Sequence, residues 1–156
     1  MDITEALHLA ENLKQEHKLH DWTMVIKRTK VSFGTCYYCP KVIALSQYLV
    51  KLNEVEQVRN TILHEIAHAL VGRGHNHDHV WRRQFIAMGG DGKRCYNSKN
   101  TNTPKPNFIG MCPNGHTSNR YRLTTRAYTM ACAKCCNAYS DGKFDPTYRF
   151  TWKRVK

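Results

Sequence analysis

The sequence has no long hydrophobic run, few acidic residues in its C-terminal part and no glutamate after Glu65. No stretch approaches the roughly 18 consecutive apolar residues that cross a bilayer, which argues against a membrane-spanning protein. The opening segment MDITEALHLAENLKQ carries acidic and amide side chains instead of the basic start and apolar stretch of a secretion signal. We therefore expect an intracellular protein, cytoplasmic or nucleoid-associated, without a membrane partner.

The shortage of acidic residues is confined to one part of the chain. Residues 1–92 hold eleven Lys/Arg against ten Asp/Glu, whereas residues 93–156 hold thirteen against two, Asp141 and Asp145. Because a solvated surface normally mixes both signs, this excess indicates a polyanionic partner. Nucleic acid is the simplest such partner.

The cysteine count of seven is odd, so a complete disulfide framework is not expected. Intracellular cysteines are normally reduced, and a set this large favours metal binding. Six of the nine histidines lie between His64 and His116, which points the same way. Cys36 and Cys39 form a C-x-x-C pair with no second pair nearby, and we interpret them as strand-end thiols.

Hydrophobic periodicity predicts an α+β fold in two parts. The polar, proline-punctuated segment 98–107 is the best domain boundary. We therefore expect a larger domain at 1–97 and a small, metal-stapled, β-rich module at 98–156. The predicted elements are a helix at 3–17, strands at 22–33 and 42–46, a helix from 53 or 54 to 71, a helix at about 78–88, and a strand at 148–152.

The strongest motif is His64-Glu65-x-x-His68, inside the long predicted helix. Two histidines four residues apart share one helical face, where their imidazoles can bind one Zn²⁺ ion. Glu65 lies beside the first ligand and can act as general base for an attacking water without binding the metal. The motif therefore predicts a zinc-dependent peptidase with Glu65 as its catalytic residue.

The candidates for the third ligand of this zinc are limited by residues that the sequence lacks. The absence of a later glutamate excludes the zinc proteases that use one as a ligand. Val71 and Gly74 stand where an H-E-x-x-H-x-x-G-x-x-H site needs glycine and histidine. The remaining candidates are His75, His77, Asp78 and His79.

The segment HEIAHALVGRGHNHDHVWRRQF resembles the SprT-like family, which includes DNA-dependent proteases. In that family the helical H-E-x-x-H is followed by a glycine-bearing loop and by a histidine four residues before an aromatic residue. Here these are His77 and Trp81. The family usually has glycine after this histidine, where this chain has Asp78. The resemblance implies a zincin-like metalloprotease domain with His77 as the third ligand of a catalytic zinc.

Two further segments extend the resemblance to about residues 20–152. Residues 89–96, GGDGKRCY, are similar to the turn after the third-ligand helix in some family members. Residues 42–53, VIALSQYLVKLN, resemble the edge strand and loop that lead into the zinc helix.

Two pairs of metal-ligand residues, sixteen residues apart, lie in the basic C-terminal part. Pro113 and Gly115 supply the tight turn that the first pair needs. Four protein ligands close a tetrahedral zinc site and help a small module to fold. The SprT-like resemblance also implies a C-terminal zinc ribbon, so we expect one catalytic and one structural Zn²⁺. The proposed structural ligands are Cys112, His116, Cys132 and Cys135, the last favoured over Cys136 by its spacing.

Arg120, Arg122 and Arg126 follow the first pair, with tyrosines interleaved. Guanidinium groups pair with phosphates and tyrosine rings stack on unpaired bases, so we expect these arginines to bind single- or double-stranded DNA. The leading hypothesis is a zinc metallopeptidase that cleaves DNA-bound or DNA-crosslinked proteins. The alternatives are a non-catalytic nucleic-acid-binding zinc protein, such as a repair or transcription accessory factor, and a zinc hydrolase of small amides.

Overall fold

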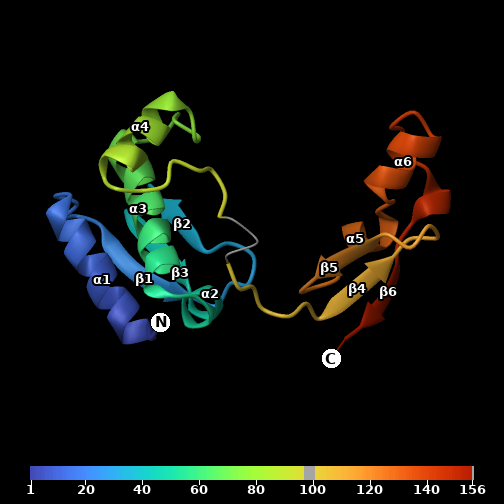
Figure 1. Ribbon diagram of the computed structural model, residues 1–156, viewed down its shortest axis with the longest axis horizontal. Helices are drawn as coiled ribbons and strands as arrows, with labels where there is room; N and C mark the ends of the chain where they lie inside the picture. The colour runs from blue at the N-terminus through green and yellow to red at the C-terminus, as the bar shows by residue number, and fades with distance from the viewer. Residues whose placement is uncertain (97–100, 156) are drawn as a thin grey trace. The chain divides into compact units, whose positions relative to one another are not determined.

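The computed structural model describes residues 1–96 and 101–155, and the chain divides into two compact units (Figure 1). Unit 1 is Met1–Pro104 and unit 2 is Lys105–Lys156. The domain boundary predicted between residues 97 and 98 falls outside the described residues. No helix in the described part of the chain is long and apolar enough to cross a membrane.

Unit 1 contains a three-stranded sheet in the order β1-β3-β2. Its strands are β1 (Thr23–Lys27), β2 (Gly34–Tyr37) and β3 (Val42–Ser46). β1 runs parallel to β3 and β2 runs antiparallel to it, so β2 lies at one edge of this sheet.

The strand predicted at 22–33 is too long, because β1 ends at Lys27. The chain then loops to reach β2, and the loop is fastened to the end of β3. Ser46 donates its backbone N–H to the Phe33 carbonyl at 2.8 Å and its hydroxyl to the Thr29 carbonyl at 2.6 Å. These bonds favour a turn over a continued strand.

Four helices complete the described part of unit 1: α1 (Ile3–Glu16), α2 (Gln47–Leu52), α3 (Val55–Val71) and α4 (His79–Ala87). α1 begins with a capping box formed by Asp2 and Glu5. The comparison of residues 42–53 with an edge strand and a loop is wrong, because β3 is central in its sheet and α2 follows it directly. The Ser46 side chain accepts the Leu49 N–H and so begins α2 at the end of β3.

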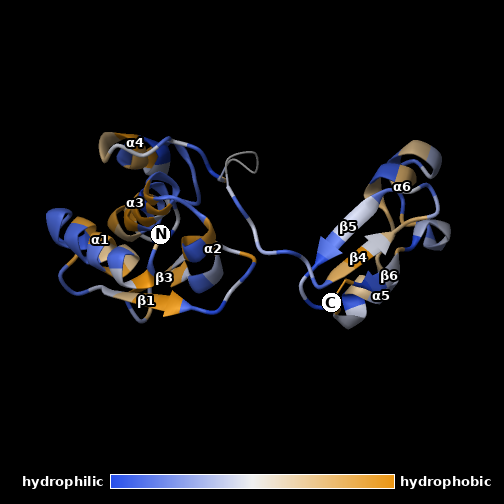
Figure 2. Cartoon of the chain, turned by 60° about the horizontal axis from the view of Figure 1, so that its bottom comes forward, coloured by the Kyte–Doolittle hydropathy of each residue, from blue (hydrophilic) through white to orange (hydrophobic). Residues whose placement is uncertain are grey.

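α3 runs through the hydrophobic core of unit 1 and packs against the sheet, α1 and α4, and much of it is coloured as hydrophobic in Figure 2. Val58, Ile62 and Ile66 are fully buried at the helical spacing that the sequence predicts. The core is therefore assembled around the helix that carries the H-E-x-x-H motif.

Unit 2 is built on a second three-stranded sheet in the order β5-β4-β6, with every pair antiparallel. Its strands are β4 (Phe108–Met111), β5 (Thr117–Arg120) and β6 (Thr151–Arg154), so the strand predicted at 148–152 begins three residues late. Two short α-helices, α5 (Thr125–Thr129) and α6 (Ala133–Tyr139), and a 3-10 helix, η1 (Pro146–Tyr148), lie between β5 and β6 in sequence. The buried cluster consists of Cys112, Cys132 and Cys135, with Tyr148 and Phe150 packed against it.

Candidate metal centres and active site

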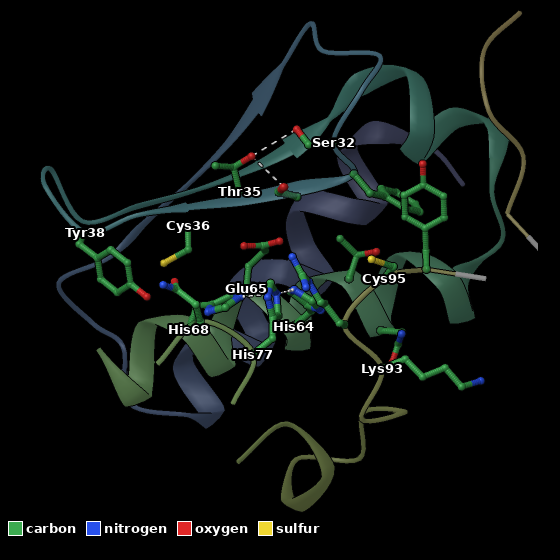
Figure 3. A pocket seen from close by; sticks show the side chains of 17 residues that line it. Ser32, Thr35, Cys36, Tyr38, His64, Glu65, His68, His77, Lys93 and Cys95 are labelled. Carbon is green, nitrogen blue, oxygen red and sulfur yellow. Dashed lines mark hydrogen bonds between the residues drawn. The ribbon is translucent and has the colours of Figure 1, made fainter. Parts of the chain in front are cut away.

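His64 and His68 lie one turn apart on α3, with ring centroids 5.1 Å apart. The core residues on the adjoining face of α3 fix the rotation of the helix, so both imidazoles point to the same side (Figure 3). The helix thus places two metal-ligand side chains on rigid backbone.

His77 comes from the loop between α3 and α4. Gly72 and Gly74 adopt positive φ values of 78° and 104°, and His77 itself adopts a φ of 58°, which is uncommon for a residue with a side chain. This path brings the Nε2 of His77 to 3.0 Å from the Nε2 of both His64 and His68.

The two other candidate histidines lie elsewhere. The Nδ1 of His75 is 2.7 Å from the Asp78 carboxylate, and His79 is an exposed first residue of α4. Asp78 also caps α4 by accepting the N–H groups of Val80 and Trp81. The aspartate that stands where the family usually has glycine therefore begins a helix and holds His75 away from the cluster.

The three-histidine cluster has the chemistry of a zinc-ligand set. Burial lowers the pKa of His64 to about 3 and that of His68 to about 4, and the neighbouring histidines add to both shifts. The imidazoles are therefore neutral near pH 7, the form that binds metal. A neutral imidazole carries a single N–H. The His77 Nε2 therefore cannot donate hydrogen bonds to the Nε2 atoms of both His64 and His68. Three convergent nitrogens of this kind fit a shared cation.

Trp81 on α4 packs against all three imidazole rings of the cluster. It is 1% exposed, its ring centroid lies 4.6 Å from those of His64 and His77, and it stacks on His68 at 5.3 Å. Its indole N–H donates to the His64 carbonyl at 3.4 Å. In the sequence Trp81 is identified only as the aromatic residue four positions after His77. Its contact with all three imidazole rings could not be predicted there, because it depends on the packing of α4 against α3.

Glu65 lies beside the cluster and is 7% exposed. Burial raises the pKa of its carboxyl to about 8, and the backbone of Cys36 lowers this pKa by a smaller amount. Such a carboxyl group is matched in pKa to accept and return a proton near neutral pH.

Glu65 and the three histidines line a cavity of about 410 Å³. Its other walls come from β2 and from residues 93–96, the segment after α4, and Figure 3 shows Glu65 between the strand that carries Thr35 and the three histidines. Cys36 and Cys95 also line the cavity, whereas Cys39 is exposed. None of the seven cysteines, all of which the structure describes, forms a disulfide.

The second cluster, in unit 2, is formed by Cys112, His116, Cys132 and Cys135, the four residues that the sequence predicts. The Sγ atoms of Cys112 and Cys135 are 3.7 Å apart, and the His116 Nδ1 lies 3.3 to 3.6 Å from the three sulfurs. Tetrahedral ligands at Zn–S of about 2.3 Å place two sulfurs about 3.8 Å apart, so this set fits zinc. Gly115, at a φ of 77°, makes the turn between Cys112 and His116. Cys136 is buried but lies outside the cluster.

The three predicted DNA-binding arginines have different surroundings. The Arg120 guanidinium lies 5.7 Å from the Trp152 ring centroid, and it donates to the Asn119 carbonyl and to the Met130 sulfur. Arg122 and Arg126 are exposed, near an exposed Tyr128. Arg120 therefore helps to hold unit 2 together, and the other two face solvent.

The α+β architecture of unit 1, with its histidine pair on α3, is that of a zincin-like metallopeptidase domain. A model of the SprT-like family matches residues 3–101, and the chain belongs to the SprT-like family. The match covers most of unit 1 and ends before unit 2, whereas the resemblance seen in the sequence extends to residue 152.

Among the solved structures that resemble the chain at low sequence identity are two metallopeptidase zymogens. The metallopeptidase zymogen jannalysin of Methanocaldococcus jannaschii is 17% identical with a TM-score of 0.47, over 64% of this chain and 86% of that one. The metallopeptidase zymogen abylysin of Pyrococcus abyssi is 22% identical with a TM-score of 0.42, over 51% and 75%. No curated protein matches the chain. The family membership and the donor set together support a zinc metallopeptidase of the SprT-like kind.

Proposed function

We propose that this chain is a DNA-associated zinc metallopeptidase that cleaves proteins bound or crosslinked to DNA. The observation that carries the enzymatic part is the buried Glu65 carboxyl beside three convergent imidazoles, at a cavity large enough for several atoms of a substrate. Burying a carboxyl group is costly unless it is used or paired. A purely structural metal site does not need it, which favours the enzyme over the non-catalytic zinc protein.

The proposed reaction is hydrolysis of a peptide bond. His64, His68 and His77 would hold a Zn²⁺ ion, which supplies a Lewis acid for the scissile carbonyl and for the charge that develops on its oxygen. Glu65 accepts a proton from the attacking water at its carboxylate. It then returns this proton to the nitrogen of the departing amine, which completes the exchange of a C–N bond for a C–O bond.

The part of β2 that lines the cavity, residues 34–36, is suited to bind the substrate backbone. Among the described residues of unit 1, β2 is paired with β3 alone, and Gly34, Thr35 and Cys36 line the cavity. An extended peptide can add to an open strand edge through main-chain hydrogen bonds, which do not depend on sequence. Binding of this kind fits a peptidase that acts on many proteins.

The DNA part of the proposal is supported by charge. Residues 105–156 hold ten Lys/Arg against two acidic residues, and Arg122 and Arg126 present their guanidinium groups to solvent. Tyr128, 60% exposed, offers a ring on which an unpaired base could stack. Unit 2 would thus bring the peptidase to DNA without contributing to the chemistry.

Cleavage of one protein in two states tests this function. The full chain with zinc is mixed with a protein crosslinked to DNA, and separately with the same protein free of DNA. We expect faster cleavage of the crosslinked form, and loss of that advantage in Arg122→Glu/Arg126→Glu. Equal rates for both forms would remove DNA from the proposal and leave a peptidase; cleavage of neither form would favour the non-catalytic alternative.

A further inference from the structure

β2 carries a glycine at the point where it passes Glu65. A Cβ atom on Gly34 would lie 2.6 Å from both the Cγ and the Oε1 of Glu65, and 2.9 Å from its Cδ. Real Cβ contacts are essentially never closer than 3.0 Å. The backbone of Gly34 lies outside the left-handed region, so its conformation does not require glycine. The neighbouring carboxyl group does.

The alternation of β2 explains how this space arises. Gly34 and Cys36 are two residues apart and therefore lie on the same face of the strand, paired with Leu45 and Ile43 of β3. This face is turned toward α3, with which β2 is in contact, and the Cys36 backbone lowers the pKa of the nearby Glu65 carboxyl. Strand and helix thus meet at Glu65, which occupies the space that a side chain at position 34 would fill.

We propose that Gly34 is a positioning residue, whose missing side chain forms the slot that holds the Glu65 carboxylate beside the three histidines. The slot is a property of the fold. Its consequence for catalysis rests on the peptidase function proposed above.

Gly34→Ala tests the consequence for catalysis. The Cγ of Glu65 would have to move, and not only the end of the side chain, so the carboxylate would leave its place near the imidazoles. A misplacement of about 1 Å can cost on the order of 10² in rate. We expect kcat for a peptide substrate to fall 10- to 100-fold, while KM and the zinc content stay at the parent values. Parent-level kcat would overturn the proposal.

Tyr37→Ala serves as the matched control for damage to the strand. Tyr37 is the last residue of β2 and lies outside the cavity. The variant should lower the unfolding temperature through the loss of strand packing and leave kcat unchanged. A fall in kcat as large as that of Gly34→Ala would assign the effect to the strand in general and overturn the assignment to the slot.

Thermal unfolding of a double-mutant cycle supplies a readout independent of activity. In the parent, Gly34→Ala is expected to lower the unfolding temperature, because the new methyl group and Glu65 compete for one space. In a Glu65→Ala background the slot is empty, and the same change should be neutral or slightly stabilising, as for other compatible Gly→Ala changes. If Gly34→Ala shifted the unfolding temperature equally in both backgrounds, the proposed slot would be wrong. Should the parent cleave nothing, the proposed function fails, yet this cycle still decides whether the slot exists.

Discussion

The two candidate metal centres differ in their ligands and in their surroundings, and we expect them to serve different purposes. Unit 1 buries a continuous cluster of aliphatic and aromatic side chains, and its three histidines lie at the edge of that core beside a cavity. In unit 2 the buried cluster is itself made of cysteines, with two aromatic rings against it. A unit with a complete core can hold a metal for chemistry, whereas we expect unit 2, with about 50 residues and a buried cluster made of cysteines, to need the metal in order to fold.

The two units also differ in the number of candidate metal ligands. The three histidines of unit 1 would hold a zinc ion with fewer than four protein ligands, and they line a cavity that a substrate can enter. The four candidate ligands of unit 2 are enough to complete a tetrahedral zinc site without a substrate position. Loss of metal should therefore have unequal consequences in the two units.

The largest expected effect is the loss of the unit 2 fold. Structural zinc in small modules contributes about 10 to 16 kcal/mol of apparent binding free energy at pH 7, so Cys112→Ser or Cys132→Ser should unfold unit 2 and leave unit 1 folded. Limited proteolysis should then release a stable fragment close to residues 1–104. Cys136→Ser is the matched control, since Cys136 is buried but outside the cluster, and it should keep unit 2 resistant. If the protease cut unit 1 of these variants as fast as it cut unit 2, the proposed difference between the two units would be wrong.

The next effect is loss of the unit 1 metal without loss of the unit 1 fold. His77→Ala removes one of three ligands, and we expect metal analysis to fall from two zinc ions per chain to one. Circular dichroism should change little, because the hydrophobic core does not depend on this loop.

His75→Ala and His79→Ala are the controls for that experiment. One of these histidines pairs with Asp78 and the other is exposed, so both variants should retain two zinc ions. Retention of the second zinc in His77→Ala would show that another residue completes the site.

A smaller effect is expected from the exposed arginines. The logarithm of DNA affinity should fall linearly with the logarithm of salt concentration, with a slope of about −0.9 for each duplex phosphate neutralised. Arg122→Ala/Arg126→Ala should reduce the magnitude of this slope by about 2. Arg120→Ala should instead lower the stability of unit 2, because its guanidinium packs on Trp152. An unchanged slope in the double variant would place the DNA contacts elsewhere.

The helix with the H-E-x-x-H motif could be predicted from the sequence because its signal is local. Its apolar residues recur at helical spacing, and the ligand pair lies one turn apart on the same element. The four residues of the unit 2 cluster could be predicted for a similar reason, since paired ligands around a tight turn form a recognisable pattern.

Features that depend on tertiary packing could not be predicted in this way. Spacing alone left three histidines and Asp78 as candidates for the third ligand. The family resemblance points to His77, and the path of the loop brings its Nε2 to the other two imidazoles. β2 is four residues long and begins with glycine, so it carries little strand signal. Gly34 lies 31 positions before Glu65, and nothing local reveals their contact. The packing of Arg120 on Trp152 joins β5 to β6 across a similar distance in sequence.

Glu65→Gln tests the central claim, that unit 1 is a peptidase with a glutamate base. The substitution keeps the size of the side chain but cannot accept a proton. The variant should keep two zinc ions, unfold at or above the parent temperature because it buries no carboxyl group, and bind DNA as the parent does. Its cleavage of a DNA-crosslinked protein should be slower by about 10² to 10⁴, the usual contribution of a general base. Cleavage at the parent rate would contradict the account.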